Sequence, residues 1–349
     1  MQTWLERRAR LILSMVAGAA LAAPAAAWDV THTGQPEREI TFATSEGTWM
    51  SVDVSPDGRT LVFDLLGDIY SLPVTGGEAT LVQGGPAMQR TPSFSPDGRK
   101  LLFLSDASGA ENAWISNPDG TDARQITHET DNMLLSAAWG ADGNTLAGEY
   151  VEGRYPARFT SEIRSFDVLG GSRVMVPTPP SHRDVSEPSL SRDGRYIYYT
   201  ERLEKGFQIY VDANHINYAV KRRDLKTGAI EEIASGWGGA LDPQVSPDGK
   251  RVAFVRRVMD KTVLFVVDLQ NNAQRAVYDG LDRDLQASYE LQANYYPHFG
   301  WFPDSRHVAI WGKGKLYKVD MDGGGATEIP FHLTAHHRIT DPIRIRHDL

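Results

Sequence analysis

The sequence predicts an all-β fold, a six-bladed β-propeller with four antiparallel strands in each blade. The tetrapeptide Ser-Pro-Asp-Gly occurs three times and three weaker copies accompany it, with aspartates at Asp57, Asp97, Asp142, Asp193, Asp248 and Asp304. Each copy lies between two short runs that are rich in β-branched and aromatic residues. Units of 40 to 56 residues that each hold several strands are typical of propeller blades.

Residues 1–27 have the three parts of a secretory signal peptide. A segment with three arginines precedes an apolar stretch at residues 11–21, and a run of small residues ends at Ala27. This stretch is shorter than the roughly 20 apolar residues that span a membrane. We therefore expect cleavage before Trp28 and no stable membrane anchor afterwards. Residues 28–331 should then form the propeller in a bacterial periplasm or outside the cell.

The repeated tetrapeptide has the chemistry of a turn. Proline presets φ for the first central position, aspartate accepts hydrogen bonds from nearby backbone N–H groups, and glycine tolerates positive φ where the next strand begins. The copies extend from Ser55 to Ser305. Because a turn explains every copy, we do not assign these aspartates to metal binding or catalysis.

Two further strands follow in each unit. In the first unit, residues 68–74 and 78–82 are predicted strands around a Thr-Gly-Gly turn. Residues 38–43 form an additional strand-like segment before the first unit, and we expect it to pair with the last blade and fasten the ring. Residues 332–349 are predicted to be a C-terminal linker or a truncated connector.

Composition excludes several classes of function. The net charge is -9, from 36 basic and 45 acidic residues, and such a surface repels a phosphate backbone, so we expect no nucleic-acid partner. The chain has no cysteine, so its fold cannot depend on disulfides even if it is exported.

Catalytic and metal-binding motifs are missing from the sequence. There is no Gly-x-Ser-x-Gly elbow and no P-loop, and His128-Glu129 is followed by Asn132 where a zincin would place its second histidine. His336 and His337 are adjacent, so in a strand they would point to opposite faces and give no ligand geometry. We therefore predict no catalytic residue, no metal site and no cofactor.

Recognition is expected in the loops that precede the first strand of each blade, because these loops converge at one mouth of the central channel. Longer insertions at residues 204–217 and 279–296 lie on the same scaffold. The predicted binding residues at this mouth are Trp49, Arg90, Asn132, Asp184, Asp242 and Tyr296.

The Ser-Pro-Asp-Gly turn between the first two strands of a blade resembles the TolB-type β-propeller repeat. Three segments are similar in sequence to the amino-terminal propeller of exported amidohydrolases. They are residues 50–75, the Gly-Leu-Asp-Arg-Asp-Leu-Gln segment at 280–286 and Ile-Pro-Phe at 329–331. In that group a metal-dependent hydrolase barrel follows the propeller. No barrel is present in this sequence, which ends at Leu349.

Two functions remain open at this point. In the first, the chain is a non-catalytic exported propeller that binds or scaffolds a protein or peptide. In the second, it is the N-terminal propeller of an amidohydrolase-family hydrolase whose barrel is missing here. The alternating Ile-Arg-Ile-Arg pattern in residues 338–349 looks like a connector into another strand and favours the second alternative.

Overall fold

The computed structural model describes residues 30, 36–152, 160–177, 184–203, 212, 214–286 and 295–340. The predicted signal peptide at 1–27, residues 341–349 and parts of both long insertions lie outside these ranges. Across the described residues the secondary structure consists of strands and turns, without a helix. No helix in this part of the chain is long and apolar enough to cross a membrane.

Six four-stranded antiparallel sheets follow one another along the chain. The first contains β2 (Val52–Val54), β3 (Thr60–Leu65), β4 (Asp68–Pro73) and β6 (Thr80–Gln83), and the second β7 (Gln89–Phe94), β8 (Leu101–Ser105), β9 (Asn112–Ser116) and β10 (Arg124–Gln125). The third contains β11 (Met133–Trp139), β12 (Thr145–Glu152), β13 (Thr160–Asp167) and β14 (Ser172–Val176), and the fourth β15 (Val185–Leu190), β16 (Tyr196–Arg202), β17 (Tyr218–Asp224) and β18 (Ile230–Ala234). The fifth contains β19 (Leu241–Val245), β20 (Arg251–Val258), β21 (Lys261–Asp268) and β22 (Gln274–Tyr278), and the sixth β23 (Gly300–Trp301), β24 (His307–Gly312), β25 (Lys315–Asp320) and β26 (Ala326–Ile329).

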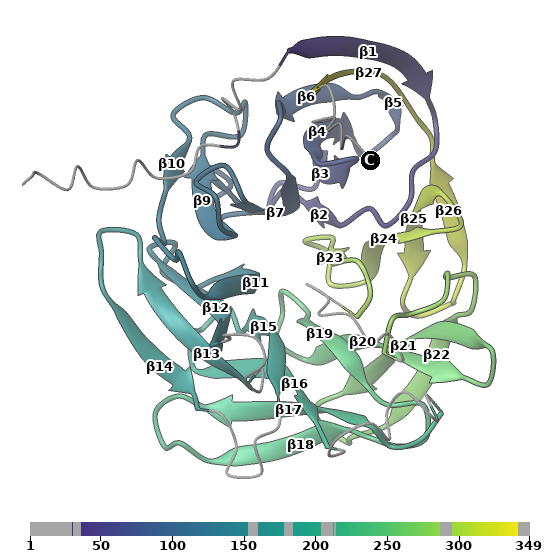
Figure 1. The fold of residues 1–349 in the computed structure, drawn as a ribbon. Coiled ribbons are helices and arrows are strands. Elements are labelled where there is room, and N and C mark those ends of the chain that lie inside the picture. Colours follow the sequence, from purple (N-terminus) through teal and green to yellow (C-terminus); the bar gives the residue numbers. More distant parts are fainter. Residues whose placement is uncertain are drawn as a thin grey trace, which may run out of the picture.

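The sheets are arranged in chain order around a common centre (Figure 1). In this view (Figure 1) the first strand of each sheet lies nearest to that centre. Strand β2 of the first sheet contacts β23 and β24 of the sixth. The second strands are buried along nearly their whole length, as in β3 and β8. Continuous burial of this kind requires cover on both faces, which neighbouring sheets provide, whereas the outermost strands β6 and β22 are largely exposed.

The repeated tetrapeptides form the turns between first and second strands. In the first copy, the Ser55 hydroxyl donates to Asp57 Oδ1 over 2.6 Å, and the same carboxylate accepts the backbone N–H of Arg59 over 3.1 Å. The hydrogen bond from Ser55 is the main reason that the pKa of Asp57 lies below its usual value. Gly58 has a φ of 71°, a left-handed conformation that glycine adopts without strain.

A three-stranded sheet joins the two ends of the described chain. Strand β1 (Glu37–Thr44) pairs antiparallel with β27 (Phe331–Thr340), and β27 pairs in parallel with β5 (Gly77–Glu78), beside the first sheet. The segment at 38–43 was predicted to pair with the last blade, and the structure pairs it instead with the strand that follows the sixth sheet. Both strands are visible as the outer layer beside β4 and β6 in Figure 1.

The prediction of a linker from residue 332 onward is wrong for residues 332–340, which belong to β27. Phe331, Leu333 and Ala335 are buried, while the alternate residues His332 and His336 are exposed. An alternation of period two is that of a strand with one covered face. The segment is therefore part of the packed structure.

Candidate functional site

The first strands carry a repeated irregularity near the centre of the molecule. Thr91, Glu187 and Asp242 each stand six residues before a turn aspartate, and their φ values are 53°, 54° and 49°. The hydrogen-bond ladder between the first and second strands of the sheet shifts register at all three positions. A non-glycine residue with positive φ is uncommon, so other contacts must hold the backbone at these positions.

Side chains from the preceding sheet supply those contacts. Asp64 of β3 accepts the N–H of Thr91 over 2.6 Å and the N–H of Ser51 over 2.8 Å. The N–H of Asp242 donates to Glu187 Oε2 over 2.8 Å and to Thr200 Oγ1 over 3.1 Å. These bonds connect the first sheet to the second and the fourth to the fifth.

The same region buries several carboxyl groups. Burial raises the pKa of Asp64 to about 6 and raises the pKa values of Glu149, Glu187 and Asp242. Glu187 accepts hydrogen bonds from the Tyr295 N–H and the Thr200 hydroxyl, over 2.8 and 2.7 Å. In the described part of the chain, no three histidine or acidic side chains are placed to hold a metal ion.

Three of the six predicted binding residues lie in this interior. The rings of Trp49 and Tyr296 pack with centroids 6.0 Å apart, and the buried Tyr296 hydroxyl donates to the backbone oxygen of Trp311 over 2.8 Å. Asp242 is buried, and its Oδ1 accepts a hydrogen bond from Gln244 over 2.8 Å. The structure thus brings Trp49 and Tyr296 together.

The other three predicted residues each make separate local contacts. Arg90 forms an ion pair of 2.6 Å with Glu111 and donates to the backbone oxygen of Leu135. Asn132 donates to the Tyr150 hydroxyl over 2.6 Å, and Asp184 pairs with Arg202 over 3.0 Å. A binding role for the six residues stays a prediction.

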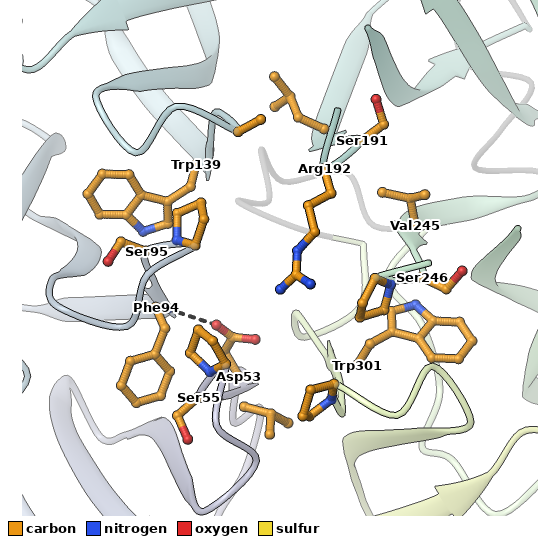
Figure 2. Close-up of a pocket in the computed structure, with 17 residues that line it drawn as sticks. Asp53, Ser55, Phe94, Ser95, Trp139, Ser191, Arg192, Val245, Ser246 and Trp301 are labelled. Carbon is orange, nitrogen blue, oxygen red and sulfur yellow. Dashed lines mark hydrogen bonds between the residues drawn. The ribbon is translucent and has the colours of Figure 1, made fainter. Parts of the chain in front are cut away.

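A pocket of about 190 Å³ lies at the opposite ends of the first strands, where the repeated turns begin (Figure 2). We call it the turn pocket. All six sheets contribute to its lining, which consists of residues 53–56, 94–96, 139, 141, 190–192, 245–247, 301 and 303. None of the six predicted binding residues is among them.

The turns around this pocket pack against one another. A Cβ atom at Gly98 would lie 3.3 Å from Cδ of Pro56, and one at Gly58 would lie 3.0 Å from Cγ of Pro303. Each glycine thus leaves room for the proline of a neighbouring turn. The fourth turn departs from this pattern, because Arg192 occupies the position that corresponds to those prolines.

Hydrogen bonds between sheets stiffen the pocket wall. The indole N–H of Trp139 donates to the Ser93 oxygen over 3.2 Å, and that of Trp301 donates to the Gln244 oxygen over 2.8 Å. Asp53 accepts the Phe94 N–H over 2.8 Å, and its burial raises its pKa to about 6. The wall of the pocket therefore combines apolar side chains with polar groups that hydrogen bonds hold in place.

The sequence predicts recognition at the opposite mouth, and this pocket is not among its predictions. A signal was nevertheless present in the repeat. The position after the turn serine is proline in Pro56, Pro96 and Pro247, whereas the fourth copy has Arg192. The turn does not require a charged residue at the position of its proline, so Arg192 is a candidate for a role in binding.

Four-stranded antiparallel sheets around one centre, linked by the same turn, define a β-propeller repeat protein. The chain belongs to the TolB β-propeller family, because residues 31–214 match the family model described as the TolB beta propeller domain. This match confirms the TolB-type resemblance of the repeat. The more specific resemblance to amidohydrolase propellers stays a prediction.

Known proteins resemble this chain at low sequence identity. The chain is 22% identical to dipeptidyl-peptidase 5 of Porphyromonas endodontalis, over 70% of this chain and 43% of that protein. It is 26% identical to the Tol-Pal system protein TolB of Wolinella succinogenes, over 54% of this chain and 43% of that one. The crystal structure of TolB from Acinetobacter baumannii superimposes with a TM-score of 0.58 at 14% identity, covering 87% of this chain and 68% of the other. The chain thus spans less than half the length of these two curated relatives.

Proposed function

We propose that this chain is a non-catalytic β-propeller that binds a segment of a protein or peptide at the turn pocket. One observation carries the proposal: all six sheets contribute their first turn to a single pocket of about 190 Å³ (Figure 2). A water molecule takes up about 30 Å³ in the liquid, so the pocket has room for about six waters or for one side chain and its backbone. That size suits the tip of an extended segment better than a folded domain.

We further propose that the six sheets are the blades of one closed ring. Contacts of β2 with β23 and β24 support closure between the first and sixth sheets, and the pairing of β1 with β27 supports it from outside. A closed ring holds its turns in fixed positions, and a preformed site of that kind loses little conformational entropy on binding.

Export to the periplasm or beyond the cell is part of the same proposal. It rests on the signal-peptide pattern of residues 1–27 and on the similarity to a protein named for the Tol-Pal system. Amino-terminal sequencing of the protein from fractionated bacteria should find Trp28 as the first residue in the periplasmic or secreted fraction. An intact amino terminus in the cytoplasm would contradict export.

The binding proposal can be tested with peptides displayed on phage and selected on the full mature chain. Ala141 lines the pocket, so Ala141→Tyr should fill it and weaken selected peptides by about tenfold or more. Thr327→Tyr adds the same ring to an exposed position of the outermost strand β26 and should leave binding unchanged. Equal binding to both variants would refute the turn pocket as the site. Loss of binding on Arg90→Ala instead would place the site at the mouth predicted from sequence.

A second function is favoured by the length of the relatives. Dipeptidyl-peptidase 5 is matched over only 43% of its length, so a propeller of this type also occurs as one part of a larger enzyme. The alternative is that this chain is the amino-terminal propeller of a hydrolase of the amidohydrolase family. Sequencing the gene beyond the codon for Leu349 tests it: a reading frame with a His-x-His barrel motif would support the alternative, and a stop codon would refute it.

A further inference from the structure

Arg192 is the one cationic side chain that lines the turn pocket. It stands at the exposed tip of the fourth turn, and Figure 2 shows its guanidinium pointing into the middle of the pocket, between Asp53 and the turns of the other sheets. Within the part of the chain that the structure describes, this guanidinium makes no hydrogen bond and no ion pair. Its five N–H donors are therefore available to a ligand.

The other side-chain donors of the pocket are already engaged. The four serine hydroxyls in its lining each donate to the aspartate of their own turn, over 2.6 to 2.7 Å. The indole N–H groups of Trp139 and Trp301 donate to backbone oxygens of neighbouring sheets. Asp53, the one carboxylate in the lining, accepts the Phe94 N–H and makes no ion pair with Arg192. Among the side chains that line the pocket, Arg192 is thus the one with donors available to a ligand.

The fold does not need an arginine at this position. The equivalent residues in the other five turns are Pro56, Pro96, Ala141, Pro247 and Pro303. Four of these residues lie within 4.0 Å of the position that a Cβ would take on the glycine of a neighbouring turn, all except Pro247. At Gly249, which belongs to the turn following Arg192, an added Cβ would meet no atom within 4 Å. An arginine at this position therefore lacks the contact between turns that the prolines make, and its side chain points into the pocket instead (Figure 2).

We propose that Arg192 binds the carboxylate of an extended peptide segment in the turn pocket. This inference rests on the proposed binding function and names the chemistry of its ligand. A guanidinium pairs with a carboxylate through two parallel N–H···O bonds, and the surrounding prolines and tryptophans suit apolar groups next to that carboxylate. The chain carries a net charge of -9, which repels anions in general, so capture of an anion requires a local cation of this kind.

The test uses the full mature chain and four probes. They are acetyl-trialanine with a free carboxyl terminus, the same peptide as its amide, acetyl-Ala-Glu-Ala-amide and inorganic phosphate. Calorimetric titration gives the affinities, and the side-chain Nε–H signal of Arg192 in ¹⁵N-labelled protein reports contact. At least one carboxylate peptide should bind about tenfold or more tightly than the trialanine amide, as expected when a charge-assisted hydrogen bond is gained, and should shift that signal. A preference for the free terminus or for the glutamate side chain identifies the source of the carboxylate.

Three variants separate the role of the charge from the role of the turn. Arg192→Pro restores the residue of the other turns and Arg192→Gln removes only the charge, and both should abolish the preference for the carboxylate. Arg192→Lys should retain part of it. Arg99→Gln serves as the matched control, because Arg99 lies in the second turn with its side chain 84% exposed and outside the pocket.

Several outcomes would overturn the inference. Equal affinity for the acid and amide peptides would do so, as would a preference that survives both Arg192→Pro and Arg192→Gln. Binding of phosphate alone would show that the pocket is not a carboxylate site. If peptides bind regardless of their charge and lose affinity only on Ala141→Tyr, the proposed function stands and this inference fails. If no peptide binds the chain at all, both fail.

Discussion

Strand β27 should contribute several kcal/mol to the stability of the whole propeller, and Phe331 tests this most sharply. Its side chain is 1% exposed and lies against Phe63 of β3, with ring centroids 5.2 Å apart. Truncation of a buried phenylalanine to alanine usually costs about 3–5 kcal/mol, from lost transfer free energy and the cavity that remains. Because Phe331 follows the sixth sheet and Phe63 belongs to the first, this contact joins the last described strand to the first sheet.

Equilibrium unfolding in urea, followed by tryptophan fluorescence and by circular dichroism, measures the effect. Phe331→Ala should lower the free energy of unfolding by about 3–5 kcal/mol with coincident transitions for both probes. Thr334→Ala, at an exposed position of the same strand, should change it by less than about 0.5 kcal/mol. If Phe331→Ala lowers the free energy of unfolding by less than about 1 kcal/mol, β27 is not packed on the propeller and the predicted linker is the better description.

Three further results are expected. Burial raises the pKa of Asp64 to about 6, so the folded state binds more protons than the unfolded state between about pH 4 and 6. The free energy of unfolding should therefore fall as the pH rises through that window, by up to about 3 kcal/mol for this group. Asp64→Asn should flatten that slope in urea titrations at pH 4, 5, 6 and 7, and an unchanged slope would exclude Asp64 as its source. Arg257 and Asp284 form an ion pair, and their side chains are 6% and 0% exposed. Arg257→Met removes the cation beside this buried carboxylate and should lower the free energy of unfolding by about 3–5 kcal/mol. An unchanged free energy of unfolding would show that water reaches Asp284. Trp301→Phe removes the indole N–H that bonds the Gln244 oxygen and should cost at least about 1 kcal/mol in the same assay, with no loss if that bond is absent in solution.

The turns could be predicted because their chemistry is local. Ser55, Pro56, Asp57 and Gly58 determine a turn through bonds within four or five residues, and five further copies repeat the pattern. The flanking apolar runs then give the first two strands of each sheet. Such local patterns can be recognised in the sequence without knowing the tertiary contacts.

Strand β27 could not be predicted in the same way. Its exposed face carries His332, Thr334 and His336, and its partner β1 lies almost 300 residues away, with Thr41 opposite His336. The polar residues suggested a linker, and only the tertiary pairing explains why Phe331 and Leu333 alternate with them. Pairing over so long a separation leaves little local signal.

The turn pocket was not predicted from the sequence. The expectation that recognition occurs at a mouth of the channel led to Arg90, Asn132 and Asp184, which the structure places in local ion pairs and hydrogen bonds. The turn pocket lies at the other ends of the same strands. Arg192 differs from the prolines of the repeat in the printed sequence, but which way its side chain points depends on the assembly of six sheets.

A cross-link between β1 and β27 tests most directly whether the six sheets are held in one closed ring. The chain has no cysteine, so Thr41→Cys with His336→Cys introduces a single pair, at positions that face each other across the antiparallel ladder. Opposite residues in such a ladder have Cα atoms about 4.5–5.5 Å apart, which lies within the range of a disulfide. We expect this pair to oxidise nearly completely in the folded protein, as an intramolecular link seen by mass spectrometry. Two free thiols in folded, oxidised protein would contradict it.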